Sequence, residues 1–202
     1  MGLSDPTDVA SYDKELAKVA IGGAQPLAGR IEIRDYDPEW PRLYAREEAG
    51  IRTILGERVV RIEHAGSTSV PGLPAKPVID IVLEVPDSSD ESTYVPDMEA
   101  AGYVLRIREP DWFEHRLFKR PDANVNLHVF TAGCEEVDRM LLFRDWLRAS
   151  AADRELYTKA KRELAVRDWK YTQQYADAKT AVVGEIMARA AAAGESRAAE
   201  RA

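Results

Sequence analysis

The sequence predicts an α+β (mixed α/β) fold: a small mixed sheet flanked by helices, with a helical C-terminal third. Three observations support this prediction. Short β-branched runs alternate with longer stretches of helical periodicity over residues 31–130. Residues 77–85 (PVIDIVLEV) are almost continuously apolar, as in a central strand covered on both faces. From residue 135 onward, apolar residues recur at helical spacing.

The first half of the chain predicts two strands and one helix before the central strand. Residues 31–33 (IEI) form a short β-branched run. The pair Asp37 and Pro38 reads as an N-cap followed by proline at the first helical position, and apolar residues then recur on one face until Gly56. A second strand is expected at residues 59–62.

The segment after the central strand predicts a helix, a strand and a hairpin. The helix covers residues 91–101 and the strand residues 103–107. Two further strands, 113–119 and 125–130, flank the turn sequence PDAN, which is a hairpin signal.

The remaining chain predicts two helices and sets the domain boundaries. One helix carries the apolar residues from Val137 to Leu147, and a long one those from Leu156 to Ile186. Residues 31–189 are the expected working domain. Residues 1–30 read as a short helix and a wrapping arm, and the alanine-rich residues 190–202 as a flexible tail that frays.

Composition excludes several classes of protein. The chain has 202 residues, of which 45% are hydrophobic and 31% charged, which is too much apolar material for a disordered chain. Neither a membrane-spanning run nor a signal-like N-terminus is visible. A net charge of −7 argues against long nucleic acid as partner. Cys134 is the only cysteine, which excludes an intramolecular disulfide and fits a cytoplasmic location.

The first candidate site is the loop GSTSVPGLPAKP, residues 66–77. Glycine-freed amides, hydroxyl donors and a cation are what a phosphate needs. The alternative is an ordinary interstrand loop stiffened by prolines, and the spacing does not match the Walker pattern. The candidate phosphate-binding residues in this loop are Gly66, Ser67, Thr68, Ser69 and Lys76.

The second candidate is Asp80, a carboxylate inside the apolar strand. Burying an unpartnered ion costs several kcal/mol, so a metal ion or a basic side chain is expected beside it. The alternative is a structural salt bridge with an arginine. Glu84 shares the face of Asp80 but lies about 13 Å further along the strand, too far to chelate the same ion.

The histidines are the third candidate group. The chain has only three, His64, His115 and His128, and each falls on a predicted strand. Asn126 and His128 share a parity and project from one face of the hairpin, whereas His115 and Arg116 lie on its other arm. Each histidine alone is best explained by a structural role; together they make a ligand-binding face plausible.

Two further features carry positive charge. Residues 102–120 hold five Lys or Arg against three acids, so this stretch is either an anion site or the wet face of a strand. Near the C-terminus, Tyr171, Tyr175 and Lys179 recur every four residues. Core packing explains the tyrosines and leaves Lys179 as a candidate phosphate ligand.

Six phrases in order resemble the GrpB-like family over residues 31–189. They are YDPEWP (36–41), HAGSTSVPGL (64–73), AKPVIDI (75–81), HRLF (115–118), NLHVF (126–130) and FRDWLR (143–148). The resemblance implies a nucleotidyltransferase-like fold, in which a Gly-Ser turn holds nucleotide phosphates and strand carboxylates hold Mg²⁺. A similar domain is fused to dephospho-CoA kinase in some actinobacterial proteins, which suggests nucleotide or CoA metabolism.

Carried onto this chain, the resemblance places Gly66 and Ser67 at the phosphates and Asp80 at the metal. The superfamily's second aspartate is replaced by Val82. One aspartate does not hold two divalent cations, so Asn126 and His128 are candidate substitutes.

These observations lead to three functional hypotheses. The first is a nucleotidyltransferase-type enzyme that transfers a nucleotide to an unknown small-molecule acceptor, with Mg²⁺ as cofactor and Asp80 and His128 as catalytic residues. The second is a non-catalytic module that binds a nucleotide or CoA-type metabolite, and the third a structural or partner-binding domain. The oligomeric state stays open. In the first two, the expected nucleotide- and phosphate-binding residues are Gly66, Ser67, Thr68, Ser69, Lys76, Arg116, Asn126 and Lys179.

Overall fold

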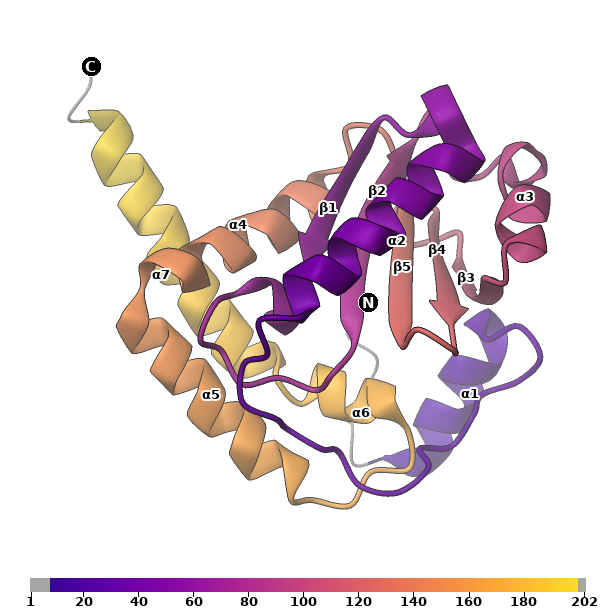
Figure 1. Ribbon diagram of the computed structural model, residues 1–202. Coiled ribbons are helices and arrows are strands. Elements are labelled where there is room, and N and C mark those ends of the chain that lie inside the picture. Colours follow the sequence, from indigo (N-terminus) through magenta and orange to yellow (C-terminus); the bar gives the residue numbers. More distant parts are fainter. Residues whose placement is uncertain (1–7, 200–202) are drawn as a thin grey trace.

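A computed structural model describes residues 8–199 and confirms the α+β fold (Figure 1). A five-stranded sheet has the order β1-β2-β5-β4-β3, in which β2 and β5 are parallel and the other neighbours antiparallel. The apolar run therefore becomes a central strand, and the predicted hairpin is the pair β4 and β5. The strands are β1 (Arg61–Ala65), β2 (Ile79–Val85), β3 (Val104–Glu109), β4 (His115–Arg120) and β5 (Val125–Thr131).

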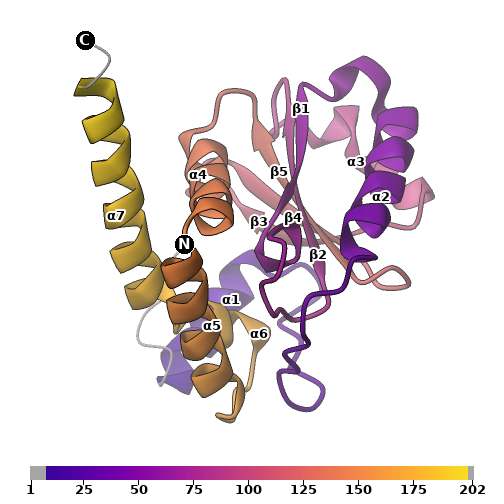
Figure 2. The ribbon, with the colours of Figure 1, turned by 60° about the vertical axis from the view of Figure 1, so that its left-hand side comes forward.

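Helices cover both faces of the sheet. In Figure 2, α2 and α3 lie on one side of the sheet and α4 lies against the other, with α7 outside α4. Helix α5 lies below α4, near α1 and α6. Within residues 8–199, no helix combines the length and apolar content needed to cross a membrane. The helices are α1 (Val9–Val19), α2 (Trp40–Leu55), α3 (Val95–Ala100), α4 (Glu135–Ala149), α5 (Ala151–Ala165), α6 (Thr172–Asp177) and α7 (Thr180–Ala199).

The alternation of β2 decides which side chains reach the candidate site. Ile79, Ile81 and Leu83 join the main apolar core together with α2 residues. The intervening side chains point to the other face, where Val82 packs with residues of α4 in a second cluster. Asp80 thereby faces the side on which α4, α5 and α6 lie, rather than the main core.

Two predicted elements are wrong. Residues 31–33 are not a strand, because Ile31 packs against Leu164 and Tyr175, and Arg34 makes only an isolated bridge with Ala75. The predicted long helix is three helices, α5, α6 and α7. The break follows α5, where the Trp169 indole donates to the Leu164 carbonyl.

Several predicted elements are present in the structure with different boundaries. β1 begins at Arg61 rather than residue 59, and the helix expected over residues 91–101 is a single 3₁₀ turn followed by α3. α7 continues to Ala199, where the sequence predicts a fraying tail. Residues 1–7 and 200–202 lie outside the described part of the chain.

Candidate functional site

A cavity of about 540 Å³ lies between the Asp80 face of the sheet and helices α1, α4, α5 and α6. This volume falls within the roughly 300–1,000 Å³ typical of small-molecule sites. Eight of the ten predicted site residues line it; Ser69 and Arg116 do not. The eight are Gly66, Ser67, Thr68, Lys76, Asp80, Asn126, His128 and Lys179.

The loop after β1 makes a tight turn against Asp80. Gly66 has φ +64°, and a Cβ there would overlap the Asp80 carboxylate. The Ser69 hydroxyl donates to the Gly66 carbonyl at 2.6 Å, and the Thr68 hydroxyl donates to the Val78 carbonyl at 3.1 Å. The prediction that Ser69 binds phosphate is therefore not supported, because its hydroxyl closes the turn. Ser67 is the hydroxyl of this turn that hydrogen-bonds at the cavity.

We expect Gly66→Ala to destabilise the protein by at least about 2 kcal/mol, because it adds a collision with Asp80 to the roughly 1–2 kcal/mol cost of a left-handed alanine. Gly72→Ala is the matched control, since Gly72 also has positive φ (+76°) but has open space where its Cβ would lie. Urea denaturation of both variants isolates the collision. Equal losses of stability would show that Gly66 is needed only for its backbone conformation.

Four lysines, called here the lysine cluster, line the cavity: Lys76, Lys119, Lys161 and Lys179. None forms an ion pair with a described carboxylate, and Arg106, beside Lys119, is equally unpaired. Burial, together with neighbouring positive charge, lowers the pKa of Lys76 and of Lys119. The cluster is thus an electropositive site without an ion pair to a described carboxylate, and the Asp80 carboxylate opposes its charge in the same cavity.

Lys161 is the most deeply buried member of the lysine cluster, with 2% of its surface exposed. Its ammonium donates to the Ser67 hydroxyl at 3.1 Å and to the Pro74 carbonyl, and it lies over the Tyr157 ring at 4.7 Å. Burial first, and then the charge of Lys179, lower its pKa to about 7. Lys161 therefore holds a proton at neutral pH only marginally, unless an anion binds beside it.

Asp80 faces this positive charge directly. One carboxylate oxygen accepts a hydrogen bond from the Asn126 amide at 2.8 Å. Burial raises the pKa of Asp80, and the Asn126 hydrogen bond and the charges of Lys179 and Lys76 oppose that rise. The predicted alternative of an arginine salt bridge is not what the structure shows, because the neighbouring cations are lysines.

The residues around Asp80 do not fit a Mg²⁺ ion held by the protein alone. Among the described residues, no group of three or more His, Cys, Asp or Glu side chains lies close enough to hold a metal ion. Val82 is buried in the second apolar cluster, and Glu84 accepts from the backbone amides of Gly133 and Cys134. The donor set at Asp80 is one carboxylate among cations, which suits an anion better than a divalent cation.

The three histidines separate into two environments. His115 and His128 line the cavity, and their rings stack at 5.2 Å between centroids. His64 lies on the opposite face of the sheet, where it stacks on Tyr44 at 4.7 Å. Two of the three histidines therefore form the ligand-facing pair.

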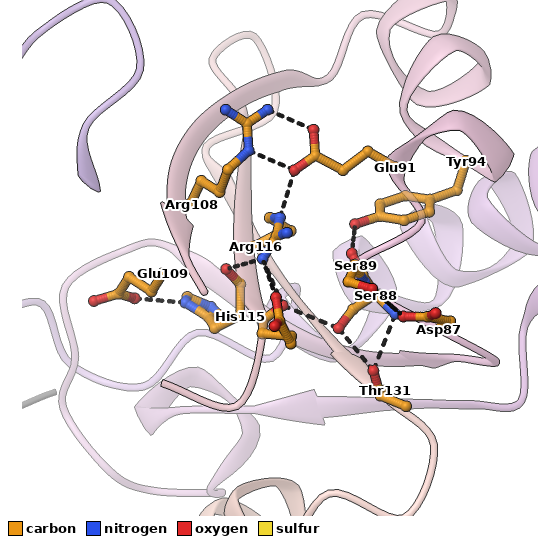
Figure 3. Close-up of polar contacts among 11 residues, drawn as sticks. Asp87, Ser88, Ser89, Glu91, Tyr94, Arg108, Glu109, His115, Arg116 and Thr131 are labelled. Atoms are coloured by element: carbon orange, nitrogen blue, oxygen red, sulfur yellow. Dashed lines mark hydrogen bonds and ion pairs between the residues drawn. The ribbon is translucent and has the colours of Figure 1, made fainter. Parts of the chain in front are cut away.

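The structure does not place Arg116 at the cavity, where it was predicted to bind phosphate, because Arg116 points to the other face of the sheet. Figure 3 shows its guanidinium beside Glu91, which also pairs with Arg108. The side chain of Arg116 is 5% exposed, and it also donates to the Glu114 carbonyl. Neighbouring residues of a strand point to opposite faces, so the cavity receives His115 and not Arg116.

Glu91→Gln is expected to destabilise the protein by about 2 kcal/mol, because it leaves the buried Arg116 charge without its main partner. This loss is smaller than the roughly 3–5 kcal/mol of a fully broken buried pair, since the Glu114 carboxylate lies 3.5 Å from the same guanidinium. Glu15→Gln, which removes an exposed partner of Lys18, is the control and should cost less than about 0.5 kcal/mol. Equal losses in chemical denaturation would contradict the structural role of Glu91.

Lys161 is a site residue that the sequence did not predict, and Lys119 and Arg106 were predicted only as members of the basic stretch 102–120. Lys161 had a visible signal: it occupies the buried stripe of α5 between Tyr157 and Leu164, where an apolar residue is expected. Lys119 lies opposite Asn126 in the hairpin. The sequence alone does not give this strand register, so it does not show that the two side chains are neighbours. Arg106 reaches the cavity through a register shift in β3 that the sequence does not indicate.

Comparisons with known proteins agree on one family. A family model described as "GrpB protein" matches residues 30–189. A UPF0157 protein of Halalkalibacterium halodurans is 58% identical over 178 residues, covering 88% of this chain and 91% of that one. The crystal structure of conserved protein GrpB from Enterococcus faecalis is 28% identical, with a TM-score of 0.68, and covers 79% of this chain and 96% of that one.

A dephospho-CoA kinase of Mycolicibacterium paratuberculosis is 32% identical over 157 residues. The match covers 65% of this chain and 39% of that protein, so the similarity concerns one part of a longer polypeptide.

Proposed function

The chain belongs to the GrpB family, and on that premise we propose that its cavity binds a nucleotide or a related phosphorylated metabolite. One observation carries the proposal: the lysine cluster and Arg106 converge on one cavity without a carboxylate ion pair among the described residues. A bound phosphate relieves the mutual repulsion of these cations and stabilises the charged form of Lys161.

The cavity also offers what the non-phosphate part of a nucleotide requires. Its walls include the aromatic rings of Tyr157, Tyr171 and Trp112, against which a base can stack. The Tyr175 hydroxyl is buried in the same wall, 4% of the residue being exposed, and has no hydrogen-bond partner among the described residues. A ligand atom that accepts a hydrogen bond would satisfy it.

Mg²⁺-dependent nucleotidyl transfer is the second candidate function, and a single observation favours it: the Asp80 carboxylate faces the expected phosphate position. A Mg²⁺ ion carried by a polyphosphate commonly uses one or two protein carboxylates. Asp80 is the carboxylate at the lysine cluster, whereas Glu109 and Glu136, which also line the cavity, are engaged by His115 and Arg139. This candidate therefore requires the ligand to provide the remaining metal ligands. Asp80 and His128 are then the catalytic residues that this candidate names.

A thermal-shift series tests the proposal. Pyrophosphate, ATP and coenzyme A should each raise the Tm, and adenosine, which lacks phosphate, should not. At about 100 times Kd a ligand stabilises by roughly 2.7 kcal/mol, or about 5–10 °C for a domain of this size. Unchanged Tm with all three phosphorylated probes would leave the proposal without support.

The second candidate function, nucleotidyl transfer, has its own test. Mass spectrometry of ATP incubated with Mg²⁺ and the protein detects transfer to water or to an added acceptor.

A further inference from the structure

Three side chains on neighbouring strands form a chain of hydrogen bonds that lies along the cavity wall. The His115 Nδ1 atom is 2.7 Å from the Glu109 carboxylate, a contact visible in Figure 3. The His115 Nε2 atom is 3.1 Å from His128 Nδ1. The order Glu109–His115–His128 is called here the histidine relay.

The surroundings of the histidine relay hold His115 in place. Its ring stacks on Phe130 at 4.8 Å and meets the Trp112 ring at 5.1 Å, and the residue is 3% exposed. Neither nitrogen of His115 is available to a ligand, since both are already engaged. Among residues 8–199, His128 has a hydrogen-bond partner at Nδ1 only, and this residue lines the cavity.

Proton counting along the relay fixes the tautomers. A carboxylate only accepts, so the Glu109 contact requires a proton on His115 Nδ1. A neutral His115 then has a lone pair on Nε2, which requires a proton on His128 Nδ1. A neutral His128 consequently carries no proton on Nε2.

We infer that the histidine relay presents His128 Nε2 to the cavity as an unprotonated hydrogen-bond acceptor for a hydroxyl group of the bound molecule. This inference rests on the proposed function for the identity of the ligand. Asn126 and His128 are two residues apart on one face of β5, so their side chains lie about 7 Å apart along the cavity. That separation matches a ligand whose phosphate lies at Asn126 and whose sugar hydroxyls lie at His128.

The competing arrangement has a doubly protonated His115. His115 would then donate from both nitrogens, and His128 Nε2 would carry the proton and become a donor. Burial lowers the pKa of His115, against the opposing effect of Glu109, and lowers that of His128 to about 3. Both shifts favour the neutral rings that the histidine relay requires.

The test is ¹⁵N-detected histidine spectroscopy of the full chain near pH 7.5. The chain has three histidines, so three ring systems are to be assigned. We expect His115 and His128 to be protonated on Nδ1. His64 is the internal reference with the opposite tautomer: the Thr68 hydroxyl donates to Val78, so it accepts from His64 Nε2. A proton on His128 Nε2, or two protons on His115, would overturn the inference.

A variant and a ligand series extend the test. Glu109→Leu removes the first acceptor, so the Nδ1 preference of His115 and then of His128 should be lost. ATP, 2′-deoxy-ATP and 3′-deoxy-ATP probe the hydroxyl: wild type should bind one deoxy analogue about tenfold more weakly than ATP, and His128→Phe should bind all three alike. Equal wild-type affinities would reject the hydroxyl contact. Failure of all three nucleotides to bind would reject the hydroxyl contact and also count against the proposed function. Tautomers of His115 or His128 other than those expected would reject the histidine relay and leave the proposed function untouched.

Discussion

Replacing Lys161 by methionine should make the ligand-free protein more stable and its phosphate binding much weaker. A pKa lowered from 10.5 to about 7 corresponds to roughly 5 kcal/mol against the charged form at low pH. Methionine loses the donors to the Ser67 hydroxyl and the Pro74 carbonyl, which offsets about 1–3 kcal/mol of that gain. The net expectation is a stabilisation of about 3 kcal/mol at pH 6, with at least tenfold weaker binding of pyrophosphate.

The sign of the pH dependence follows from linkage. Between pH 7 and 10.5 the unfolded chain holds a proton on Lys161 that the folded protein does not, so wild-type stability rises with pH across this window. Below about pH 7 both states are protonated and the full cost is present. The stabilising effect of methionine is therefore largest at pH 6 and falls steadily towards pH 10.

Urea denaturation at pH 6, 8 and 9.5, with titration calorimetry of pyrophosphate, measures both effects. Lys159→Met is the matched control, because Lys159 is an exposed lysine on the same helix. It should change the free energy of unfolding by less than about 0.5 kcal/mol and the affinity for pyrophosphate by less than about twofold. At pH 8, wild type should take up a proton on binding pyrophosphate, and Lys161→Met should not. A Lys161→Met protein that binds pyrophosphate normally would remove Lys161 from the anion site.

The fold was predictable where the pattern of burial leaves a direct trace in the sequence. The central strand has an unbroken apolar run because both of its faces are covered, and the hairpin has a turn between two β-rich segments. The strand predicted at residues 31–33 failed because an apolar arm that packs on helices has the same composition as a short strand. The prediction of one long C-terminal helix failed because Tyr171, Tyr175 and Lys179 keep helical spacing although only Tyr175 lies within α6.

The site was predictable where a residue type contradicts its local pattern. Asp80 in an apolar strand and the hydroxyl-rich turn before it both led to the cavity. Arg116 was assigned wrongly because local positive charge does not tell which face a strand residue occupies. The lysine cluster draws its members from the loop before β2, from β4, from α5 and from the segment after α6, so only the tertiary structure brings them together.

Asp80→Asn should strengthen the binding of metal-free ATP by about tenfold to a hundredfold. The substitution keeps the shape of the side chain and a hydrogen-bond partner for Asn126, and it removes a negative charge from the anion site. Two unit charges about 5 Å apart repel by roughly 3 kcal/mol at an effective dielectric constant of 20. Because the pKa of Asp80 is raised, wild type should approach the variant as the pH falls, and the difference in affinity should shrink.

The same variant separates the two candidate functions when Mg²⁺ is added. If the cavity only binds the anion, Mg²⁺ reduces the charge of ATP and weakens binding to wild type and to Asp80→Asn alike. If Asp80 holds a ligand-bound metal for nucleotidyl transfer, Mg²⁺ strengthens binding to wild type alone, and the variant loses any turnover. Calorimetry with and without Mg²⁺ decides between them, and weaker binding of metal-free ATP by the variant would contradict the placement of phosphate beside Asp80. The outcome depends on Asp80 because, among the described residues, no group of three or more His, Cys, Asp or Glu side chains could hold the metal ion without the ligand.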